Sequence, residues 1–571
     1  MSLFPLPHSL EQFDPPTWAK FQPYYAELQS RPLSLANGRQ WLNDWSTLLR
    51  LISEGFNRIY IAKTLDTTDT AAEAAFLDFI HNVMPEMQVA EQTLRERLLA
   101  LNLPDADIAL TLRQMRTESE LFRAENIPLI TKVEELTNEY EKLTGGLKAD
   151  WDGEEKNLSQ LEALLQEKDR AVRERAYRTM MALWLGVREP LNEIYSQLLS
   201  LRNQIATQAD LPDYRTYAFL EKGRFEYSPE DCFTFHAAIE AVVVPAVARI
   251  MARRRQKLGL ERLRPWDLNV ELSDQPPLKP YDGQAELIKG AQRIFQQVDP
   301  ALGSQFKIMA DEKLLDLDTR PGKGLGGYCT ELPLRQRPFI FMNGVGRHDD
   351  VQTLLHEGGH AFHVFETAAL PLIWQTHAPM EFCEVASMAM ELLAAPYLTR
   401  DQGGFYSPAE AARARIEHLE GILVFLPYMA VVDAFQHWVY TNPETAASAA
   451  QCDAKWDELW TRFMPELDWG GLEEVRLTGW HRKPHIFESP FYYIEYGLAQ
   501  VGALQVWHNS RQNQAAAVAA YRRALALGDT KTLPDLFAAA GVEFRFDSAM
   551  LAELTDLVEA TVAELATHGE G

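Results

Sequence analysis

The sequence has few cysteines. It contains four, Cys232, Cys329, Cys383 and Cys452, and they are scattered along 571 residues without paired spacing. A disulfide framework needs paired cysteines, and so does a zinc site built from cysteines alone, so neither is expected. This usage is typical of a reducing compartment and predicts a cytoplasmic location.

Basic side chains are also in deficit. The chain has 55 Lys and Arg against 81 Asp and Glu, which gives a formal net charge of −26. The phosphates of a nucleic acid would be repelled by such a surface, so a nucleic-acid partner is not expected.

Long apolar runs are missing as well. No stretch reaches the roughly 18 uninterrupted apolar residues of a membrane span. The Ala- and Val-rich run Ile239–Ala248 is shorter and is followed by Arg249, which favours a buried helix. The first residues, MSLFPLPHSLEQFDPP, lack the positive start and apolar run of a signal peptide. We therefore expect no signal peptide and no membrane association.

Strand-like segments are scarce, and most of the chain predicts helix. Apolar residues recur at spacings of three and four over Leu158–Leu185, Pro190–Ala209 and Pro229–Leu258. The length exceeds that of a single hydrophobic core, so we expect two or more lobes.

The clearest strand is the apolar and aromatic segment Arg337–Asn343 (RPFIFMN). The Pro near its start suits an edge strand, because Pro cannot donate to a neighbouring ladder. The glycine-rich segment before it, Pro321–Tyr328, would let backbones approach closely. An ordinary small sheet is one interpretation, and a strand that carries substrate is the other. The second interpretation predicts contacts to substrate from Gly326, Gly327, Phe339, Ile340, Phe341 and Met342.

The segment Arg347–Glu366 (RHDDVQTLLHEGGHAFHVFE) predicts a helix with unusual features. Asp349 followed by Gln352 favours a helix start capped by the Asp side chain. Gly358 and Gly359 lie inside the helix, where each costs on the order of 1 kcal/mol relative to Ala. Their missing side chains would let another backbone or a substrate come close.

The same helix carries a metal-binding pattern. His356 and His360 are four residues apart, so both imidazoles lie on one face and can reach one ion. Glu357 is offset by one position, as expected for a base that acts on metal-bound water.

A zinc hydrolase usually has three protein ligands and an open position for water. The third histidine of the longer metalloprotease pattern is absent, because that position is Glu366. The segment Pro379–Tyr397 predicts a second, largely apolar helix, in which carboxylates would be costly to bury without a cation. The candidates for the third ligand are Glu381, Glu384 and Glu391. Solvated surface charges are the alternative interpretation.

These motifs resemble a known family. HEGGHAFH at 356–363, followed by EFCEVAS at 381–387, is similar to the oligoendopeptidase F and thimet oligopeptidase family of zinc peptidases. The 23 residues between His360 and Glu384 suit that family. The resemblance favours the oligoendopeptidase F branch and extends to LGLERLRPWDL at 258–268, RPGKGLGGYC at 320–329, PFIFMN at 338–343, PFYYIEY at 490–496 and DRAVRERAY at 169–177.

The resemblance implies roles for individual residues. His356, His360 and Glu384 would hold one Zn²⁺ per chain, and Glu357 would be the catalytic base. Glu391 and His363 would support the ligands. A C-terminal group would border the cleft and donate hydrogen bonds to the reacting carbonyl; it consists of His485, Tyr493 and Tyr496, with Tyr492 among the substrate-binding residues.

The resemblance also implies a fold and a function. The fold would be mainly α, a two-lobed helical zincin-type metallopeptidase with a deep central channel and a small β-sheet beside the active-site helix. Residues 1–190 would form an N-terminal helical lobe and residues 191–571 the catalytic domain. The protein would be an endopeptidase that hydrolyses internal bonds of short oligopeptides. The alternatives are a carboxypeptidase or dipeptidase on a related fold, and a non-catalytic peptide-binding helical protein; monomer and homo-oligomer both remain open.

Overall fold

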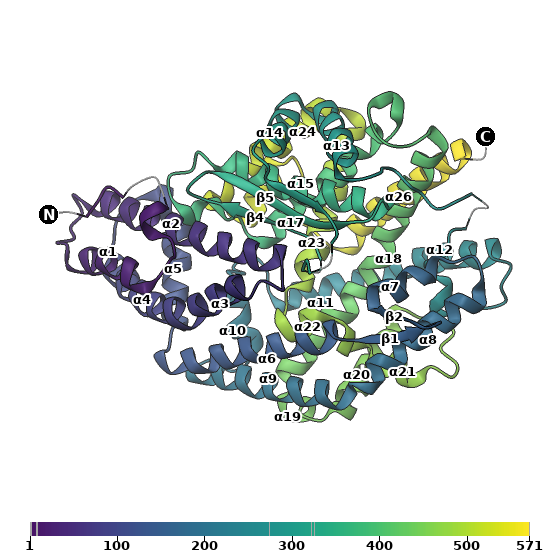
Figure 1. The fold of residues 1–571 in the computed structure, drawn as a ribbon, viewed down its shortest axis with the longest axis horizontal. Helices are drawn as coiled ribbons and strands as arrows, with labels where there is room; N and C mark the ends of the chain where they lie inside the picture. The colour runs from purple at the N-terminus through teal and green to yellow at the C-terminus, as the bar shows by residue number, and fades with distance from the viewer. Residues whose placement is uncertain (1–2, 7–9, 273–274, 321, 325, 570–571) are drawn as a thin grey trace.

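The chain folds into a mostly helical body with two small sheets (Figure 1). The structure is a computed structural model that describes residues 3–6, 10–272, 275–320, 322–324 and 326–569. The mainly α prediction is confirmed. Positions 321 and 325 of the glycine-rich segment lie outside the described residues.

The first helices lie together at one end of the molecule, at the left of Figure 1. Their apolar faces form a core of their own around the buried indoles of Trp41 and Trp45, to which Leu372 from far along the chain also contributes. The helices are α1 (Trp18–Ser30), α2 (Gly38–Leu65), α3 (Thr70–Asp78), α4 (Met84–Leu101) and α5 (Ala109–Leu121).

The helices predicted from periodicity in the next part of the chain are confirmed, with one division. The segment Leu158–Leu185 is two helices, and the second begins where the Asp169 side chain accepts the Ala171 N–H at 2.9 Å. The elements are α6 (Ile127–Gly145), α7 (Leu158–Ala163), α8 (Arg170–Gly186), α9 (Arg188–Gln208), α10 (Tyr214–Glu221), α11 (Pro229–Ala238) and α12 (Val244–Lys257). A π-helical turn at Ile239–Val243 joins the last two.

A small hairpin in this region was not predicted. Strand β1 (Lys148–Trp151) pairs antiparallel with β2 (Glu154–Asn157) around Gly153, whose φ of 85° few other residues adopt. The strands are short and largely polar, so they lack the apolar alternation that signals a strand.

The second sheet has three strands in the order β3–β5–β4. They are β3 (Leu315–Asp318), β4 (Tyr328–Leu332) and β5 (Arg337–Gly344), with β3 parallel and β4 antiparallel to β5. The strand prediction at 337–343 is confirmed, but the prediction of an edge position is wrong, because β5 is central. The ladder with β3 begins near Ile340, so Pro338 lies before it and its missing N–H breaks no bond there.

The position of β5 also changes the predicted substrate contact. Both of its sides are paired, so a substrate cannot add to it as a further strand, and that prediction is wrong. Phe339, Ile340, Phe341 and Met342 are buried in the core. Among the described strands of this sheet, the edge nearest the helix of the histidine motif belongs to β4.

The helices that cover this sheet carry the predicted site. Helix α15 packs on β5 and β4, and α17 packs on α15 (Figure 1). This confirms the predicted small sheet beside the active-site helix. The helices of this part are α13 (Gln284–Val298), α14 (Pro300–Asp311), α15 (His348–Thr367), α16 (Ile373–Thr376) and α17 (Met380–Ala394).

The C-terminal part completes the body. Helix α23 packs against both α17 and α18 and so joins the sheet side to the lower helices of Figure 1. The elements are α18 (Pro408–Thr441), α19 (Pro443–Ala446), α20 (Ala449–Phe463), α21 (Glu473–Leu477), α22 (Pro484–Glu488), α23 (Tyr493–Gln512), α24 (Gln514–Leu525), α25 (Leu533–Ala539) and α26 (Ser548–Gly569).

Two helical stretches, Pro229–Lys257 and Pro408–Thr441, are long and apolar enough to cross a membrane by length and composition alone. In their most apolar windows, however, 50% and 61% of the residues are buried inside the protein. Core helices of soluble proteins have the same property, so these stretches are weak evidence for a membrane span.

Candidate metal centre and active site

Helix α15 begins two residues earlier than the sequence predicts. The Asp350 carboxylate, rather than that of Asp349, accepts the backbone N–H groups of Arg347 at 2.7 Å and Val345 at 2.9 Å. The Tyr281 hydroxyl donates to the same carboxylate. The capping prediction for Asp349 is therefore wrong, because the buried Asp350 faces the incoming loop while Asp349 faces outward.

Helices α15 and α17 approach closely at Gly359. A Cβ at this position would lie 2.4 Å from the backbone oxygen of Ala386 and 2.5 Å from the Cα of Ser387. The prediction that a missing side chain admits another backbone is confirmed. This close packing sets Glu384 of α17 opposite the histidines of α15.

The donor atoms of His356, His360 and Glu384 form one cluster. All lie within 4.8 Å of one another, and Glu384 Oε2 is 3.5 Å from His356 Nε2 and 3.7 Å from His360 Nε2. A tetrahedral ion with bonds of about 2.0–2.1 Å holds neighbouring donors roughly 3.3 Å apart. Two imidazoles and one carboxylate at these separations fit a zinc ion with one position open.

His356 is oriented by a chain of hydrogen bonds. Its Nδ1 lies 2.7 Å from Glu391 Oε1, so Nε2 is turned towards the cluster, and the other Glu391 oxygen lies 2.8 Å from His418 Nε2. Burial alone would raise the pKa of Glu391, but hydrogen bonds from His356 and His418 lower it to about 2. Sequence reasoning missed His418, because it reaches Glu391 from α18 and no local pattern links them.

Glu384 is held by two further hydroxyls. Tyr492 donates to Oε1 at 2.9 Å and Ser387 to Oε2 at 3.2 Å. Tyr492, predicted to bind substrate, thus contacts the candidate third ligand directly.

The other predicted carboxylate of α17 points elsewhere. Glu381 accepts the Tyr227 hydroxyl at 2.6 Å and lies 3.8 Å from Arg224, which also pairs with Glu495 at 2.7 Å. Glu381 belongs to this buried ionic network and does not join the His356 cluster.

Glu357 lies beside the cluster, against strand β4. Burial raises the pKa of its carboxyl to about 7, partly opposed by the neighbouring His356 and by a hydrogen bond from the Cys329 backbone. The carboxyl therefore faces the edge of β4, next to the donors of the cluster.

The predicted C-terminal aromatic group is brought together. The Tyr496 hydroxyl lies 3.5 Å from His485 Nε2, and the ring of His485 lies 5.1 Å from that of Tyr493. Burial, together with the charges of Glu384 and Glu357, raises the pKa of Tyr496, so its hydroxyl stays protonated and faces the cluster. Tyr493 is instead packed against Phe425 and Tyr428.

His363 does not join the metal cluster. Burial lowers its pKa to about 3, and the ring hydrogen-bonds to the backbone of Leu525. It fills the space behind His360 rather than touching the donors of the cluster.

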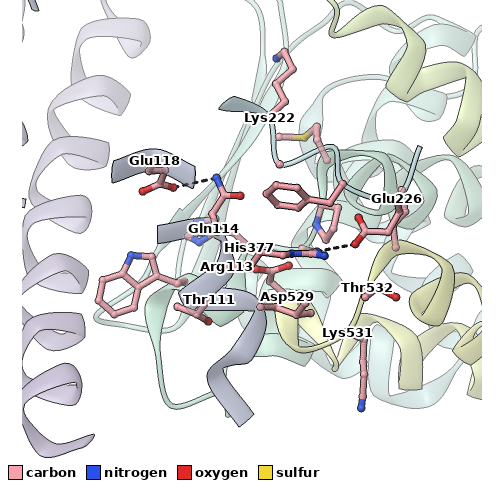
Figure 2. Close-up of a pocket in the computed structure, with 18 of the residues that line it drawn as sticks. Thr111, Arg113, Gln114, Glu118, Lys222, Glu226, His377, Asp529, Lys531 and Thr532 are labelled. Carbon is pink, nitrogen blue, oxygen red and sulfur yellow. Dashed lines mark hydrogen bonds and ion pairs between the residues drawn. The ribbon is translucent and has the colours of Figure 1, made fainter. Parts of the chain in front are cut away.

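Two cavities flank these residues. One of about 540 Å³ is lined by His485, Tyr493 and Tyr496, with Glu391 and His418 at its wall. The other, of about 350 Å³, includes Tyr492 and is rich in charge; Figure 2 shows its labelled side chains Arg113, Lys222, Glu226, His377 and Asp529. Tyr492 and Tyr496, whose rings lie 5.1 Å apart, connect the two.

Comparison with known proteins identifies the family of the chain. The model of peptidase family M3 matches residues 163–556. An oligoendopeptidase F of Lactococcus lactis subsp. cremoris is 24% identical over 434 residues, covering 70% of this chain and 66% of that protein. An oligoendopeptidase F homolog of Borreliella burgdorferi is 23% identical over 295 residues, which is 49% of each chain. The matched stretch thus spans between half and two thirds of these relatives.

Two solved structures cover the whole fold. A structure described as an oligoendopeptidase F has a TM-score of 0.90 at 26% identity and covers 98% of this chain and 99% of its own. PZ peptidase A, solved with an inhibitor, has a TM-score of 0.88 at 26% identity and covers 98% of both chains. On its family match, fold and motifs, this chain belongs to peptidase family M3, in its oligoendopeptidase F branch.

Proposed function

We propose that the protein is a zinc-dependent endopeptidase that hydrolyses internal bonds of short oligopeptides. The observation that carries this proposal is the cluster of His356, His360 and Glu384 with the Glu357 carboxyl beside it. Membership of a peptidase family and the likeness to oligoendopeptidases support it.

In this proposal His356, His360 and Glu384 hold one zinc ion. When bound, the ion supplies Lewis acidity to the scissile carbonyl and to the attacking water. Glu391 keeps His356 turned inward, and the hydroxyl of Tyr492 steadies Glu384.

Glu357 carries the proton in the reaction. Its buried carboxylate takes a proton from the attacking water and then passes it to the leaving amine. The Tyr496 hydroxyl, with His485 behind it, donates to the oxygen that gains negative charge. Each group acts from a fixed position, because α17 packs directly on both α15 and α23.

The substrate lies extended along β4. Its free edge faces Glu357, and backbone pairing there would hold many sequences alike. Gly326 and Gly327 precede this strand, and Gly326 has a φ of 84°, which suits a close backbone approach. At the far end the edge is covered by α2, whose Asn57 donates to the Glu331 carbonyl at 2.8 Å.

The two cavities lie on either side of the proposed scissile bond. With volumes of about 350 and 540 Å³, they admit a flexible oligopeptide and exclude a folded domain. The proposal includes a cytoplasmic location, no nucleic-acid or membrane partner, and a division into residues 1–190 and 191–571.

Cleavage from a chain end is the second candidate function. Lys222 lines the smaller cavity and Lys483 the larger one, and either amine could bind a terminal carboxylate. A carboxypeptidase would require such a cation at a fixed distance from the metal.

Mass spectrometry of the products from a mixed peptide library tests the proposal. We expect internal cleavage that a chelator abolishes and zinc restores. Release of terminal residues or dipeptides alone would favour the second function. Activity that is unchanged by the chelator would contradict the metal site itself, and binding without any cleavage would favour a peptide-binding protein.

A further inference from the structure

A second cluster of metal-binding side chains lies away from the proposed active site. Cys232 and His236 are one turn apart on α11, and Asp433 and His437 are one turn apart on α18. The donor atoms of Cys232, Asp433 and His437 all lie within 4.8 Å of one another. We propose that these three side chains bind a structural divalent ion of the zinc class, and that His236 positions Asp433.

The first argument is a buried carboxylate whose only ion-pair partners in the described chain are histidines. Asp433 is 0% exposed, and its ion-pair partners within the described chain are His236, at 2.9 Å, and His437, at 3.2 Å. Neither Lys nor Arg pairs with it in that part of the chain. A buried carboxylate is costly without a cation, and an ion bound beside the two imidazoles would supply one.

The second argument is the orientation of the donors. His437 is 2% exposed, yet neither of its ring nitrogens has a hydrogen-bond partner, and Oδ1 of Asp433 also has none. His437 Nε2 lies 3.2 Å from Asp433 Oδ2 but is poorly aligned for a hydrogen bond to it. Donors that converge without bonding to one another are typical of ligands, whose separation around a tetrahedral ion is roughly 3.3 Å.

The donor types select the metal. A thiolate, an imidazole and a carboxylate suit Zn²⁺, whereas Mg²⁺ and Ca²⁺ prefer oxygen donors alone.

The surroundings favour a structural role over a catalytic one. The ring of His437 is packed against the rings of Phe233 at 4.8 Å, Phe491 at 5.2 Å and Phe219 at 5.9 Å. This apolar enclosure leaves no room for substrate. Phe233 is 43% exposed, so movement of that ring would provide an entry path for an ion.

The site would also support the loop before α23. Phe491 has a φ of 65°, a conformation that non-glycine residues seldom adopt. Its N–H donates to the side chain of Gln436, the residue before His437, at 2.8 Å. An ion on His437 would therefore stabilise the strained residue that precedes Tyr492.

Cobalt titration of the full-length, metal-free protein tests this inference. Co²⁺ bound to a thiolate has a near-ultraviolet charge-transfer band, which the nitrogen and oxygen donors of the His356 cluster cannot produce. We expect wild type to show the band and to bind two equivalents. Cys232→Ser should lose the band and one equivalent, while Cys452→Ser, which changes another buried cysteine, should keep both.

Two further variants separate ligation from folding. His437→Gln retains the thiol but should lose the second equivalent. His236→Gln should keep the band and weaken cobalt binding roughly 10–100-fold, as expected for a residue that positions a ligand. A wild-type protein that binds cobalt without the band, or a band that persists in Cys232→Ser, would overturn the inference. Because the band reports Cys232 alone, the result does not depend on the active-site assignment.

Discussion

The two candidate metal clusters share a plan and differ in access. Each combines residues one turn apart on one helix with an acidic or sulfur donor from another helix. The side chains of His356 and His360 are 25% and 22% exposed, whereas those of His236 and His437 are 5% and 2% exposed. The comparison teaches that donor type alone does not assign catalysis; an open position and a neighbouring proton acceptor are also needed.

The proton acceptor is the largest difference between the clusters. Glu357→Gln should reduce kcat roughly 10²–10⁴-fold, because the amide cannot accept a proton, while metal content stays unchanged. Peptide hydrolysis and bound zinc are measured on the same sample. Glu73→Gln, the same change at an exposed position of α3, is the control and should leave both unchanged.

The third ligand is the next point of comparison. Glu384→Gln should release the active-site ion and abolish hydrolysis, since only two ligands remain. Glu381→Gln, one turn away, should keep the ion, because Glu381 contacts Tyr227 and Arg224 instead. Elemental analysis of both variants measures the bound zinc. Zinc lost only from the Glu381 variant would contradict the assignment of Glu384 as the third ligand.

Only the cluster of His356, His360 and Glu384 has an aromatic group beside it, formed by His485, Tyr493 and Tyr496. Tyr496→Phe should lower kcat roughly 10²–10³-fold and change KM less, because its hydroxyl stabilises the reacting oxygen. Tyr493→Phe should act in the same direction with a smaller effect, since that ring is packed against Phe425 and Tyr428. Steady-state kinetics on one peptide separate the change in kcat from the change in KM. A change in KM alone for Tyr496→Phe would make Tyr496 a binding residue.

The close packing of α15 against α17 positions the cluster of His356, His360 and Glu384. Gly359→Ala should destabilise the protein by about 1–3 kcal/mol and weaken metal binding, because the new Cβ meets the backbone of α17. Gly421→Ala, in helix α18 with no atom near its added Cβ, should instead stabilise by up to about 1 kcal/mol. Denaturant unfolding measures both changes, and equal effects would refute the role of Gly359.

Glu91 shows how a buried carboxylate behaves without histidine partners. Burial raises its pKa to about 7, although Tyr25 and Trp45 donate to it. In the unfolded chain this carboxyl ionises near pH 4.5, so between pH 4.5 and 7 the folded state binds more protons and stability falls as pH rises. The slope is at most about 1 kcal/mol per pH unit, and Glu91→Gln should remove it. The control is Thr93→Ser on the same helix, which removes no ionisable group and should leave the slope of unfolding free energy against pH unchanged.

The features that sequence predicted are mostly local. His356, Glu357 and His360 follow from helical spacing, and the helices follow from periodicity. Family resemblance indicated Glu384, which spacing alone could not separate from Glu381 and Glu391.

The features that sequence missed depend on tertiary packing. Three of them join segments that are far apart in the chain: the contact of His418 with Glu391, the central position of β5, and the proximity of Cys232 to Asp433. The scarcity of cysteine argued against a cysteine zinc site, yet one buried cysteine in a mixed donor set is enough for the proposed second ion.

The central claim is that one zinc ion is held by His356, His360 and Glu384. Diffraction from crystals grown with zinc, measured on both sides of the zinc absorption edge, locates the metal directly. The account predicts an anomalous peak within about 2.0–2.2 Å of both Nε2 atoms and of a Glu384 oxygen. An empty density between these side chains at saturating zinc, or a peak bound by Glu381 instead, would contradict it.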